Sequence, residues 1–333
     1  MASAAISVGG VCFHSPAFLA PLSGITDRSF RILAERFGAG SVVSEMIASE
    51  ALANGQRDMQ RRLLPPARLP HIVQLAGCQP RWMAEGARIA ADEGADIIDI
   101  NMGCPCKRVT NGYAGSALMR VPDIAISLVE AVVGAVSLPV TVKMRLGWDD
   151  ASLNAPVIAR RAVDAGAQMI AVHGRTRQQF YKGAARWEPV RAVVEAVDVP
   201  VVINGDIASA DDARRALSLS GAAAVMIGRG AQGRPWLVGQ VSAALRADRV
   251  AAAPEGEALR NLVLEHFELM LSEYGVEVGL RCARKHLGWY LETLGETRGV
   301  PEAQRRALLT AESPEEVRRL VASIFYGELR VAA

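Results

Sequence analysis

The sequence predicts an α/β fold, a TIM (β/α)8 barrel, followed by an all-helical domain. Eight short apolar segments recur about 23 to 43 residues apart, the spacing that βα units have. Helix signals fill the gaps between them, and eight such units make this barrel. After about residue 245 the strand signals stop and only helical patterns remain. We therefore expect a barrel over 1–245 and a helical domain over 246–333.

The predicted strands are nearly all apolar, which is typical of parallel strands covered on both faces. In chain order they lie at 18–20, 42–44, 72–75, 97–100, 140–144, 169–172, 201–203 and 224–227. The widest gap, between the fourth and fifth strands, holds an extra glycine-rich loop at 102–115 ahead of its helix. Barrel enzymes keep their chemistry on loops at the C-terminal strand ends, so this loop is a candidate for function.

The helices between the strands carry recognisable start signals. These are Thr26 or Asp27 as the cap of the first helix, Pro80 opening a helix that ends near Gly94, Pro122 with Asp123, and Ser209 with Asp212 as a capping box. In the C-terminal part, helical patterns occupy 257–274, 280–294, 301–309 and 314–326. The two parts of the chain therefore differ in architecture.

Composition excludes several classes of protein. Half of the residues are hydrophobic and 22% are charged, which excludes intrinsic disorder and low-complexity fibres. The net charge of +2 is too small to indicate a nucleic-acid partner by itself. Residues 251–333 hold ten basic and thirteen acidic side chains, so the helical domain is not a broadly basic clamp.

The longest apolar stretch, 124–142, contains Glu130 and Pro139 and is expected to be a buried helix and strand, not a membrane span. No Lys or Arg precedes Arg28, so a secretory signal is not expected and we predict a cytoplasmic protein. The cysteines number five, an odd count that argues against a disulfide framework. We expect free thiols.

The residues that follow the predicted strands lie where a barrel has its mouth, and few of them are apolar. They are Pro21, Leu22 and Ser23 after the first strand, then Glu45, Gln74, Asn101, Lys143 with Arg145, His173 with Arg175, Asn204 with Gly205 and Asp206, and Gly228 with Arg229. Amide, ammonium, guanidinium and imidazole groups around one mouth indicate a large anionic ligand. The glycine-containing turns after strands seven and eight are the usual phosphate position, so a phosphorylated cofactor is predicted.

Some of these residues also have a purely structural interpretation. Gln74 could equally well cap its strand, and an isolated His173 would more often be structural than a ligand. Lys143 is harder to explain in that way, because an unpaired lysine at the end of a buried strand would be desolvated. It requires an anionic partner.

Two cysteines lie in the glycine-rich loop, at the sequence Asn101-Met-Gly-Cys-Pro-Cys. They are spaced by one residue and no second Cys or His pair follows, so we expect no metal site. Cys104, close behind a strand, is placed for acid or nucleophile chemistry. Cys106 could have only a packing role.

The motifs together resemble the bacterial tRNA-dihydrouridine synthases, most closely their B-type branch, over nearly the whole chain. The matching segments, in the family's order, are Ala20-Pro-Leu-Ser-Gly-Ile-Thr-Asp, Val73-Gln-Leu-Ala-Gly, Asn101-Met-Gly-Cys-Pro, Lys143-Met-Arg-Leu-Gly-Trp, Val172-His-Gly-Arg-Thr, Asn204-Gly-Asp-Ile, Met226-Ile-Gly-Arg-Gly and Arg284-Lys-His-Leu-Gly-Trp-Tyr. The chain departs from the family at Leu22-Ser23, where Met-Ala is commoner, and at Cys106, where the family usually has a small residue.

This resemblance implies an enzyme that uses FMN and NADPH to reduce the C5–C6 double bond of particular uridines in tRNA. It implies that Cys104 protonates C5, which a neutral thiol with a usual pKa of about 8.5 can do at pH 7. The implied flavin contacts are Pro21, Leu22, Ser23, Gln74, Lys143, His173, Asn204, Gly205, Asp206, Gly228 and Arg229. Asn101, Arg145 and Arg175 are the substrate-side candidates at the mouth, with Asn101 holding the uracil.

A uridine in folded tRNA must leave its stack to reach this mouth. Arg281, Arg284 and Lys285 share a helix face by their spacing and are expected to contact the tRNA backbone, although a solvated face would look the same. We expect a monomer. One alternative is an FMN-dependent barrel that reduces a free small molecule. This alternative does not explain why the chain has a helical domain. The other is a non-enzymatic RNA-binding protein, which would give the strand-end residues no purpose.

Overall fold

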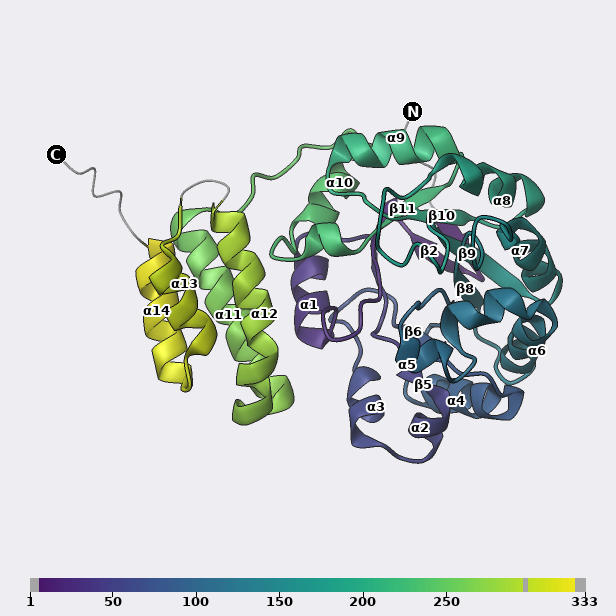
Figure 1. The fold of residues 1–333 in the computed structure, drawn as a ribbon, viewed down its shortest axis with the longest axis horizontal. Helices are drawn as coiled ribbons and strands as arrows, with labels where there is room; N and C mark the ends of the chain where they lie inside the picture. The colour runs from purple at the N-terminus through teal and green to yellow at the C-terminus, as the bar shows by residue number, and fades with distance from the viewer. Residues whose placement is uncertain (1–5, 296–298, 327–333) are drawn as a thin grey trace.

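The computed structural model describes residues 6–295 and 299–326. Within them, nine strands form one sheet, in which every neighbouring pair is parallel, in the order β4-β3-β11-β10-β9-β8-β7-β6-β5. The strands are β3 (Ala17–Leu19), β4 (Ser41–Val42), β5 (Ile47–Ala48), β6 (Ile72–Ala76), β7 (Ile97–Met102), β8 (Val140–Arg145), β9 (Ala167–His173), β10 (Val201–Asn204) and β11 (Ala224–Ile227). Helices surround this curled sheet (Figure 1).

The two edge strands, β4 and β5, are the two ends of one interrupted strand. β4 pairs with β3, β5 pairs with β6, and between them Val43 forms a bridge with Ile72. The Ser44 N–H also donates to the Ile72 carbonyl at 2.9 Å. The sheet therefore closes into a barrel with eight strand positions, and the predicted fold class is confirmed. The second strand is longer than predicted and broken, because the chain leaves the ladder at Glu45 and Met46.

A β-hairpin that the sequence analysis did not predict lies outside the sheet. β1 (Ile6–Val8) and β2 (Val11–Phe13) pair antiparallel around Gly9 and Gly10, whose φ angles of 56° and 90° require glycine. Ile6, Val8 and Phe13 pack in one cluster with residues from the N-terminal ends of the barrel strands. The hairpin therefore covers the end of the barrel opposite the predicted mouth.

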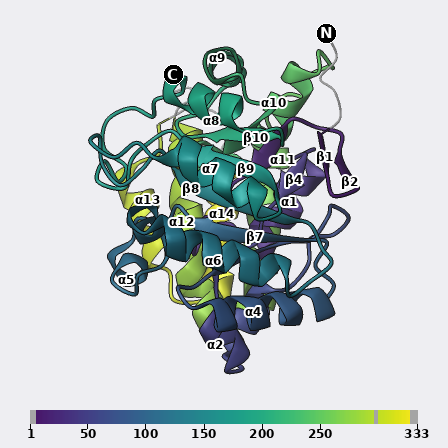
Figure 2. The same cartoon turned by 90° about the vertical axis from the view of Figure 1, so that its right-hand side faces the viewer.

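Helices and short 3₁₀ segments follow the strands. They are α1 (Arg28–Arg36), α2 (Ser49–Ala53), α3 (Arg57–Arg62), α4 (Pro80–Asp92), α5 (Lys107–Thr110), η1 (Gly115–Arg120), α6 (Pro122–Val133), α7 (Ala155–Asp164), η2 (Glu188–Val190), α8 (Arg191–Ala196), α9 (Ala210–Ser220), η3 (Arg229–Ala231) and α10 (Leu237–Leu245). Figure 2 shows α4, α6 and α7 on the face of the barrel turned away from the C-terminal helices.

The predicted helix starts are well matched, with two refinements. Asp27 caps α1, because its Oδ1 accepts from the Phe30 N–H at 3.0 Å, whereas the Thr26 hydroxyl accepts from the Leu22 N–H. The Ser209 hydroxyl accepts from the Asp212 N–H at 3.0 Å, as in a capping box, but the Asp212 carboxylate reaches back to the N–H of Ala208, one residue earlier than that motif requires.

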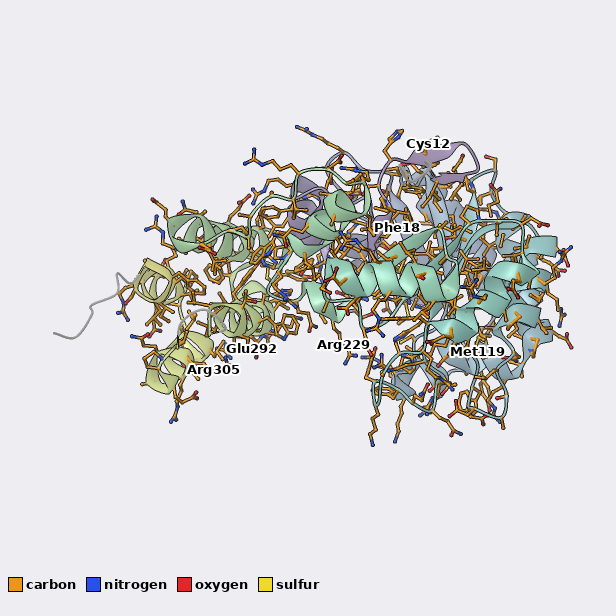
Figure 3. All side chains as sticks on the ribbon, turned by 90° about the horizontal axis from the view of Figure 1, so that it is seen from above. Cys12, Phe18, Met119, Arg229, Glu292 and Arg305 are labelled. Carbon is orange, nitrogen blue, oxygen red and sulfur yellow. The ribbon has the colours of Figure 1, made fainter. Side chains whose placement is uncertain are left out.

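Four helices form the C-terminal part: α11 (Gly256–Tyr274), α12 (Val276–Gly295), α13 (Glu302–Thr310) and α14 (Pro314–Tyr326). They stand together beside α1 (Figure 1) and have their own hydrophobic cluster. α12 begins four residues earlier than predicted because Gly275, with a φ of 76°, makes the turn from α11 alone. Arg305 on α13 pairs with Glu292 on α12 at 3.2 Å, and the two residues lie side by side in Figure 3.

The hydrophobic cluster of the C-terminal helices is not confined to them. Leu33 of α1 and Trp236, just before α10, belong to it, with Phe37 packed against it. Arg36 also pairs with Glu265 of α11 at 2.6 Å. The barrel and the C-terminal helices therefore share a packed interface. In the described part of the chain, each helix is too short or too polar to cross a membrane.

Gly239, inside α10, should not tolerate a side chain, because a Cβ there would overlap the carbonyl oxygen of Phe37. We expect Gly239→Ala to lower the free energy of unfolding by about 1–3 kcal/mol, the usual cost of overpacking. The matched control is Gly288→Ala in α12, where the nearest atom to a new Cβ would be 3.8 Å away. Removing that helix-interior glycine should leave stability unchanged or raise it by up to about 1 kcal/mol. Urea unfolding measures both, and equal losses would contradict the close approach at Gly239.

Candidate active site

A cavity of about 760 Å³ opens at the C-terminal ends of the barrel strands. Among the residues predicted for the site, those that line it are Pro21, Leu22, Ser23, Gln74, Asn101, Cys104, Lys143, Arg145, His173, Asn204, Gly205, Asp206, Gly228 and Arg229. Side chains within the strands β6 to β10 and residues of several strand-following loops thus meet in one place. Arg175, Arg281, Arg284 and Lys285 are not part of the lining.

One side of the cavity is cationic. Lys143, at the end of β8, donates from Nζ to the Asn204 side-chain oxygen at 3.1 Å. Burial, reinforced by the charge of Arg145, lowers the pKa of Lys143 to about 8. Burial and the same cations hold the pKa of His173 well below its usual value, so its imidazole is neutral at pH 7. An anion placed here would relieve the repulsion among these cations.

Asp206, at the end of β10, links three loops. Arg175, only 2% exposed, donates from Nη1 to Asp206 Oδ1 at 2.9 Å and from Nη2 to Oδ2. Asp206 also accepts from the Ala185 N–H at 2.7 Å and from Arg229 at 3.1 Å. Burial alone would raise the pKa of this carboxyl, but these hydrogen bonds and charges outweigh it and leave the pKa below its usual value. The carboxylate is therefore ionised and holds the loops together.

Glycines let the loops after β10 and β11 pack tightly. Gly205 has a φ of 120°, and a Cβ there would lie 2.7 Å from the His173 ring. A Cβ on Gly230 would overlap the carbonyl oxygen of Ile207. Both glycines line the cavity and let the backbone of these loops pack closely on its neighbours, as glycines do in phosphate-binding loops.

The part of the cavity wall next to Lys143 rests on a buried chain of hydrogen bonds across β6, β7 and β8, where Asn101 is the strand partner of Lys143. Asp99, in the middle of β7, accepts from the Thr141 hydroxyl at 2.6 Å and from Gln74 Nε2 at 2.7 Å. Gln74 Oε1 accepts from Asn101 Nδ2 at 2.7 Å, and Asn101 Oδ1 accepts from the Cys104 N–H at 3.0 Å. Each amide is thereby oriented by its neighbour, starting from a carboxylate that can accept on both oxygens.

The sequence analysis missed Asp99 and Thr141. A signal for Asp99 was present, since a charged residue within an apolar strand requires buried partners. Burial raises the pKa of the Asp99 carboxyl, while its hydrogen bonds and the charge of Lys143 partly oppose that shift. Thr141 carries no such signal, because threonine is common in strands.

Cys104 lies at the rim of the cavity, directly after β7. Its carbonyl accepts from both the N–H of Ser116, at 3.0 Å, and the Ser116 hydroxyl, at 2.9 Å, which fixes the loop. Burial raises the pKa of the Cys104 thiol, so the thiol is protonated at neutral pH. Cys106 also lines the cavity and is exposed. All five cysteines are free thiols, and within 6–295 and 299–326 no cluster of His, Cys, Asp and Glu could hold a metal ion.

The two buried arginines at the mouth, Arg145 and Arg175, donate mainly to protein groups. Arg145 donates to the carbonyls of Gly103, Thr176 and Phe180 at 2.8–2.9 Å. Arg175 donates to the carbonyls of Lys182 and Gly183 in addition to Asp206. Both guanidinium groups thus organise loops around the mouth, and only that of Arg145 also borders the cavity.

Tyr181 is a lining residue that the sequence analysis did not identify. It lies on the loop after β9, and its ring is 4.9 Å from the Arg229 guanidinium and 6.5 Å from the His173 ring. Arg145 lies 5.5 Å from the same ring. No sequence pattern marked this tyrosine, because its place depends on the path of an irregular loop.

The three basic residues predicted to form one patch on α12 have different surroundings. Arg281 is exposed and lies 3.6 Å from Glu277 on the same helix. Arg284 is half-buried and donates to the carbonyl of Ala311 at 3.3 Å. Lys285 points toward the barrel, with its Nζ 3.2 Å from the position a Cβ on Gly24 would take. Only Arg281 is fully available at the surface.

Comparison with known proteins gives consistent matches. The model of the dihydrouridine synthase family matches residues 18–323. A probable tRNA-dihydrouridine synthase of Rhizobium leguminosarum bv. phaseoli is 54% identical over 299 residues, which cover 90% of this chain and 92% of that protein. One of Rhodobacter capsulatus is 52% identical over 322 residues, 96% of this chain and 98% of that protein. The tRNA-dihydrouridine synthase B of Xanthomonas axonopodis pv. citri is 46% identical over 286 residues, 86% of each chain.

Removing the negative charge of Asp206 should loosen the mouth. We expect Asp206→Asn to lower the free energy of unfolding by about 2–3 kcal/mol, at the low end for a broken buried pair because Asp206 is partly open to water. The stabilisation belongs to the ionised carboxylate, so the difference from wild type should shrink as the pH falls through its lowered pKa. Asp211→Asn is the control, because the 88% exposed Asp211 pairs with Arg214 on the surface and should contribute less than about 0.5 kcal/mol. Urea unfolding at several pH values measures the free energy of unfolding of both variants. Equal losses in Asp206→Asn and Asp211→Asn would contradict the role given to Asp206.

Proposed function

This chain belongs to the dihydrouridine synthase family, and we propose that it reduces the C5–C6 double bond of particular uridines in tRNA. The observation that carries the proposal is the protonated Cys104 thiol in a cavity that also presents the cationic side chains of Lys143, Arg145 and Arg229. A base bound in this cavity would meet both a proton donor and a bound anionic cofactor. Because tRNA is its substrate, we place the enzyme in the cytoplasm.

We propose FMN as the cofactor and NADPH as the reductant. The residues present suit FMN: Lys143 and Arg229 offer positive charge at the cavity, and Gly205 lines it with its backbone packed too closely on His173 for a side chain. His173, Asn204, Asp206 and Gly228 complete the phosphate side, while Pro21, Leu22, Ser23 and Gln74 contact the flavin ring. When bound, FMN supplies the hydride, taken from NADPH, that C6 of the uracil receives. Lys143, next to the ring, would stabilise negative charge there.

The protein's own contribution to the second half of the reaction is a proton. We assign it to Cys104 Sγ, which delivers it to C5 of the base. The raised pKa keeps the thiol in the form that can donate. Asn101, which orients the Cys104 backbone, also has its side chain at the cavity and is proposed to hold the uracil. Arg145 joins the substrate side, and we now propose a positioning role for Arg175.

We propose residues 1–245 as the catalytic barrel and 246–333 as the region that binds the tRNA backbone. Extruding a uridine from its stack costs a few kcal/mol, which backbone contacts must offset. Of the three basic residues first expected there, Arg281 has the exposure that a phosphate contact requires. Arg284 and Lys285 are half-buried and stay proposed contacts of the tRNA backbone, with the Arg284 side chain also held by its hydrogen bond to Ala311.

The function is tested by comparing two cysteine variants. We expect the wild-type protein to carry non-covalent FMN and to form dihydrouridine in unmodified tRNA with NADPH. Cys104→Ala should keep FMN and still oxidise NADPH, but should form dihydrouridine about 10²–10⁴-fold more slowly, because only the proton donor is lost. Cys106→Ala should remain active.

Mass spectrometry of tRNA nucleosides gives the product, and absorbance at 340 nm gives NADPH. Equal reduction of free uridine would favour a reductase of small molecules. If Cys106→Ala were inactive and Cys104→Ala active, the proton donor would be Cys106 and not Cys104.

Binding of FMN should depend on the protonation of Lys143. Its pKa is lowered to about 8 by burial, so the ammonium is present below that pH and is lost as the pH rises through it. We expect the FMN dissociation constant to rise above pH 8, and Lys143→Met to weaken binding by about tenfold or more at pH 7 while removing that pH dependence. Exposed Lys107 provides the control, Lys107→Met. Flavin fluorescence titrations between pH 6.5 and 9.5 measure both, and an unchanged pH dependence in Lys143→Met would refute the assignment.

A further inference from the structure

The segment 228–233, which follows β11, is held between the barrel and the C-terminal helices. Its cavity-lining residues include Gly228, Gly230 and Gln232. At its inner end, a Cβ on Gly230 would overlap the carbonyl oxygen of Ile207, in the loop after β10. At its outer end, Gly233 has a φ of 67°, and a Cβ there would overlap a backbone carbonyl of α12. The segment therefore has backbone contacts on both sides.

One face of α12 supplies the outer contacts. The carbonyl that approaches Gly233 belongs to Trp289, and the Thr293 hydroxyl donates to the Gly233 carbonyl at 3.3 Å. Lys285, one turn before Trp289, lies over Gly24 in the loop after β3. These three positions are spaced by four residues, so they lie on one helix face.

The two loops that this face contacts are neighbours. β11 and β3 pair directly in the barrel, so the loops that follow them lie side by side at the mouth. Both loops line the cavity, and Figure 3 shows Arg229, at the start of η3, on the side of the barrel next to the C-terminal helices. α12 therefore supports the part of the cavity that we assign to the cofactor phosphate and ring.

A loop with three glycines in six residues has little rigidity of its own. It can bind a phosphate well only if its backbone is already fixed in the binding geometry, since any ordering on binding reduces affinity. Ile207 fixes one end of the segment through the barrel. The other end has no neighbouring barrel strand to fix it and depends on α12.

We propose that Trp289 and Thr293 are positioning residues for the cofactor, so that the C-terminal helices set FMN affinity in addition to contacting tRNA. The proposal rests on FMN being the cofactor. It assigns α12 a role inside the active site that requires no contact with the cofactor itself. By linkage, bound FMN must in turn stabilise this part of α12.

The experiment compares FMN dissociation constants, by fluorescence titration, for glycine and threonine variants. We expect Gly233→Ala to raise the constant by about tenfold, because the new methyl group displaces the segment. The control, Gly55→Ala, carries the same kind of backbone strain at a φ of 72° but meets no atom within 4 Å, and should change the constant by less than about twofold. Thr293→Val should raise it about threefold, and Thr293→Ser should restore the wild-type value.

A second measurement on the wild-type protein does not depend on how well a variant folds. Saturation with FMN should slow hydrogen exchange of the backbone amides in the second half of α12 and leave those of α14 unchanged. Wild-type affinity in Gly233→Ala and Thr293→Val, with unaltered exchange in α12, would overturn the inference and leave the proposed function intact. A wild-type protein that binds no FMN would refute both.

Discussion

The ion pair between Arg175 and Asp206 is the interaction on which the mouth of the barrel depends. A guanidinium group this deeply buried is strongly stabilised when an ionised carboxylate compensates its charge. Asp206 does so with both oxygens and, through Ala185 and Arg229, also gathers the loops after β9 and β11. The cationic character of the cavity is therefore a consequence of its architecture: positive groups outnumber the acidic partners available to them.

Two carboxylates shape the cavity, the partly exposed Asp206 and the buried Asp99, and their pKa values move in opposite directions. Asp206 is surrounded by cations and N–H donors, which lower its pKa. Asp99 lies deeper in the barrel, where loss of hydration dominates and raises its pKa. The first organises the side that we assign to the cofactor. The second orients the amides of Gln74 and Asn101, and Asn101 in turn holds the Cys104 backbone, so the loop that carries the proton donor is positioned from inside the barrel wall.

The sequence was sufficient for the parts of the fold that follow periodic rules. Strand positions and helix starts could be predicted because parallel strands are apolar on both faces and helix caps are local. The break between β4 and β5 could not, since it depends on how the two neighbouring strands pair. The hairpin of β1 and β2 was missed although Gly9 and Gly10 mark its turn, because its flanking strands are only three residues long.

For the site, strand ends were a reliable guide and loops were not. Most of the polar residues predicted near strand ends do line the cavity, which is why Gln74 and Lys143 could be chosen from the sequence, whereas Glu45 is not in the lining. Whether an arginine there faces a ligand depends on which carbonyl groups the loops present to it, as Arg145 and Arg175 illustrate. The same holds for Lys285, whose surroundings are set by the packing of α12 on the barrel.

Leu33 and Trp236 of the barrel belong to the hydrophobic cluster of the C-terminal helices. This limits how the two regions can be separated or exchanged. A barrel cut off after α10 would present these apolar side chains, together with Phe37, to water and would tend to aggregate. The two regions should therefore unfold cooperatively rather than one after the other. In evolution or engineering, recombination of the helices between relatives would succeed only when this barrel surface is exchanged with them.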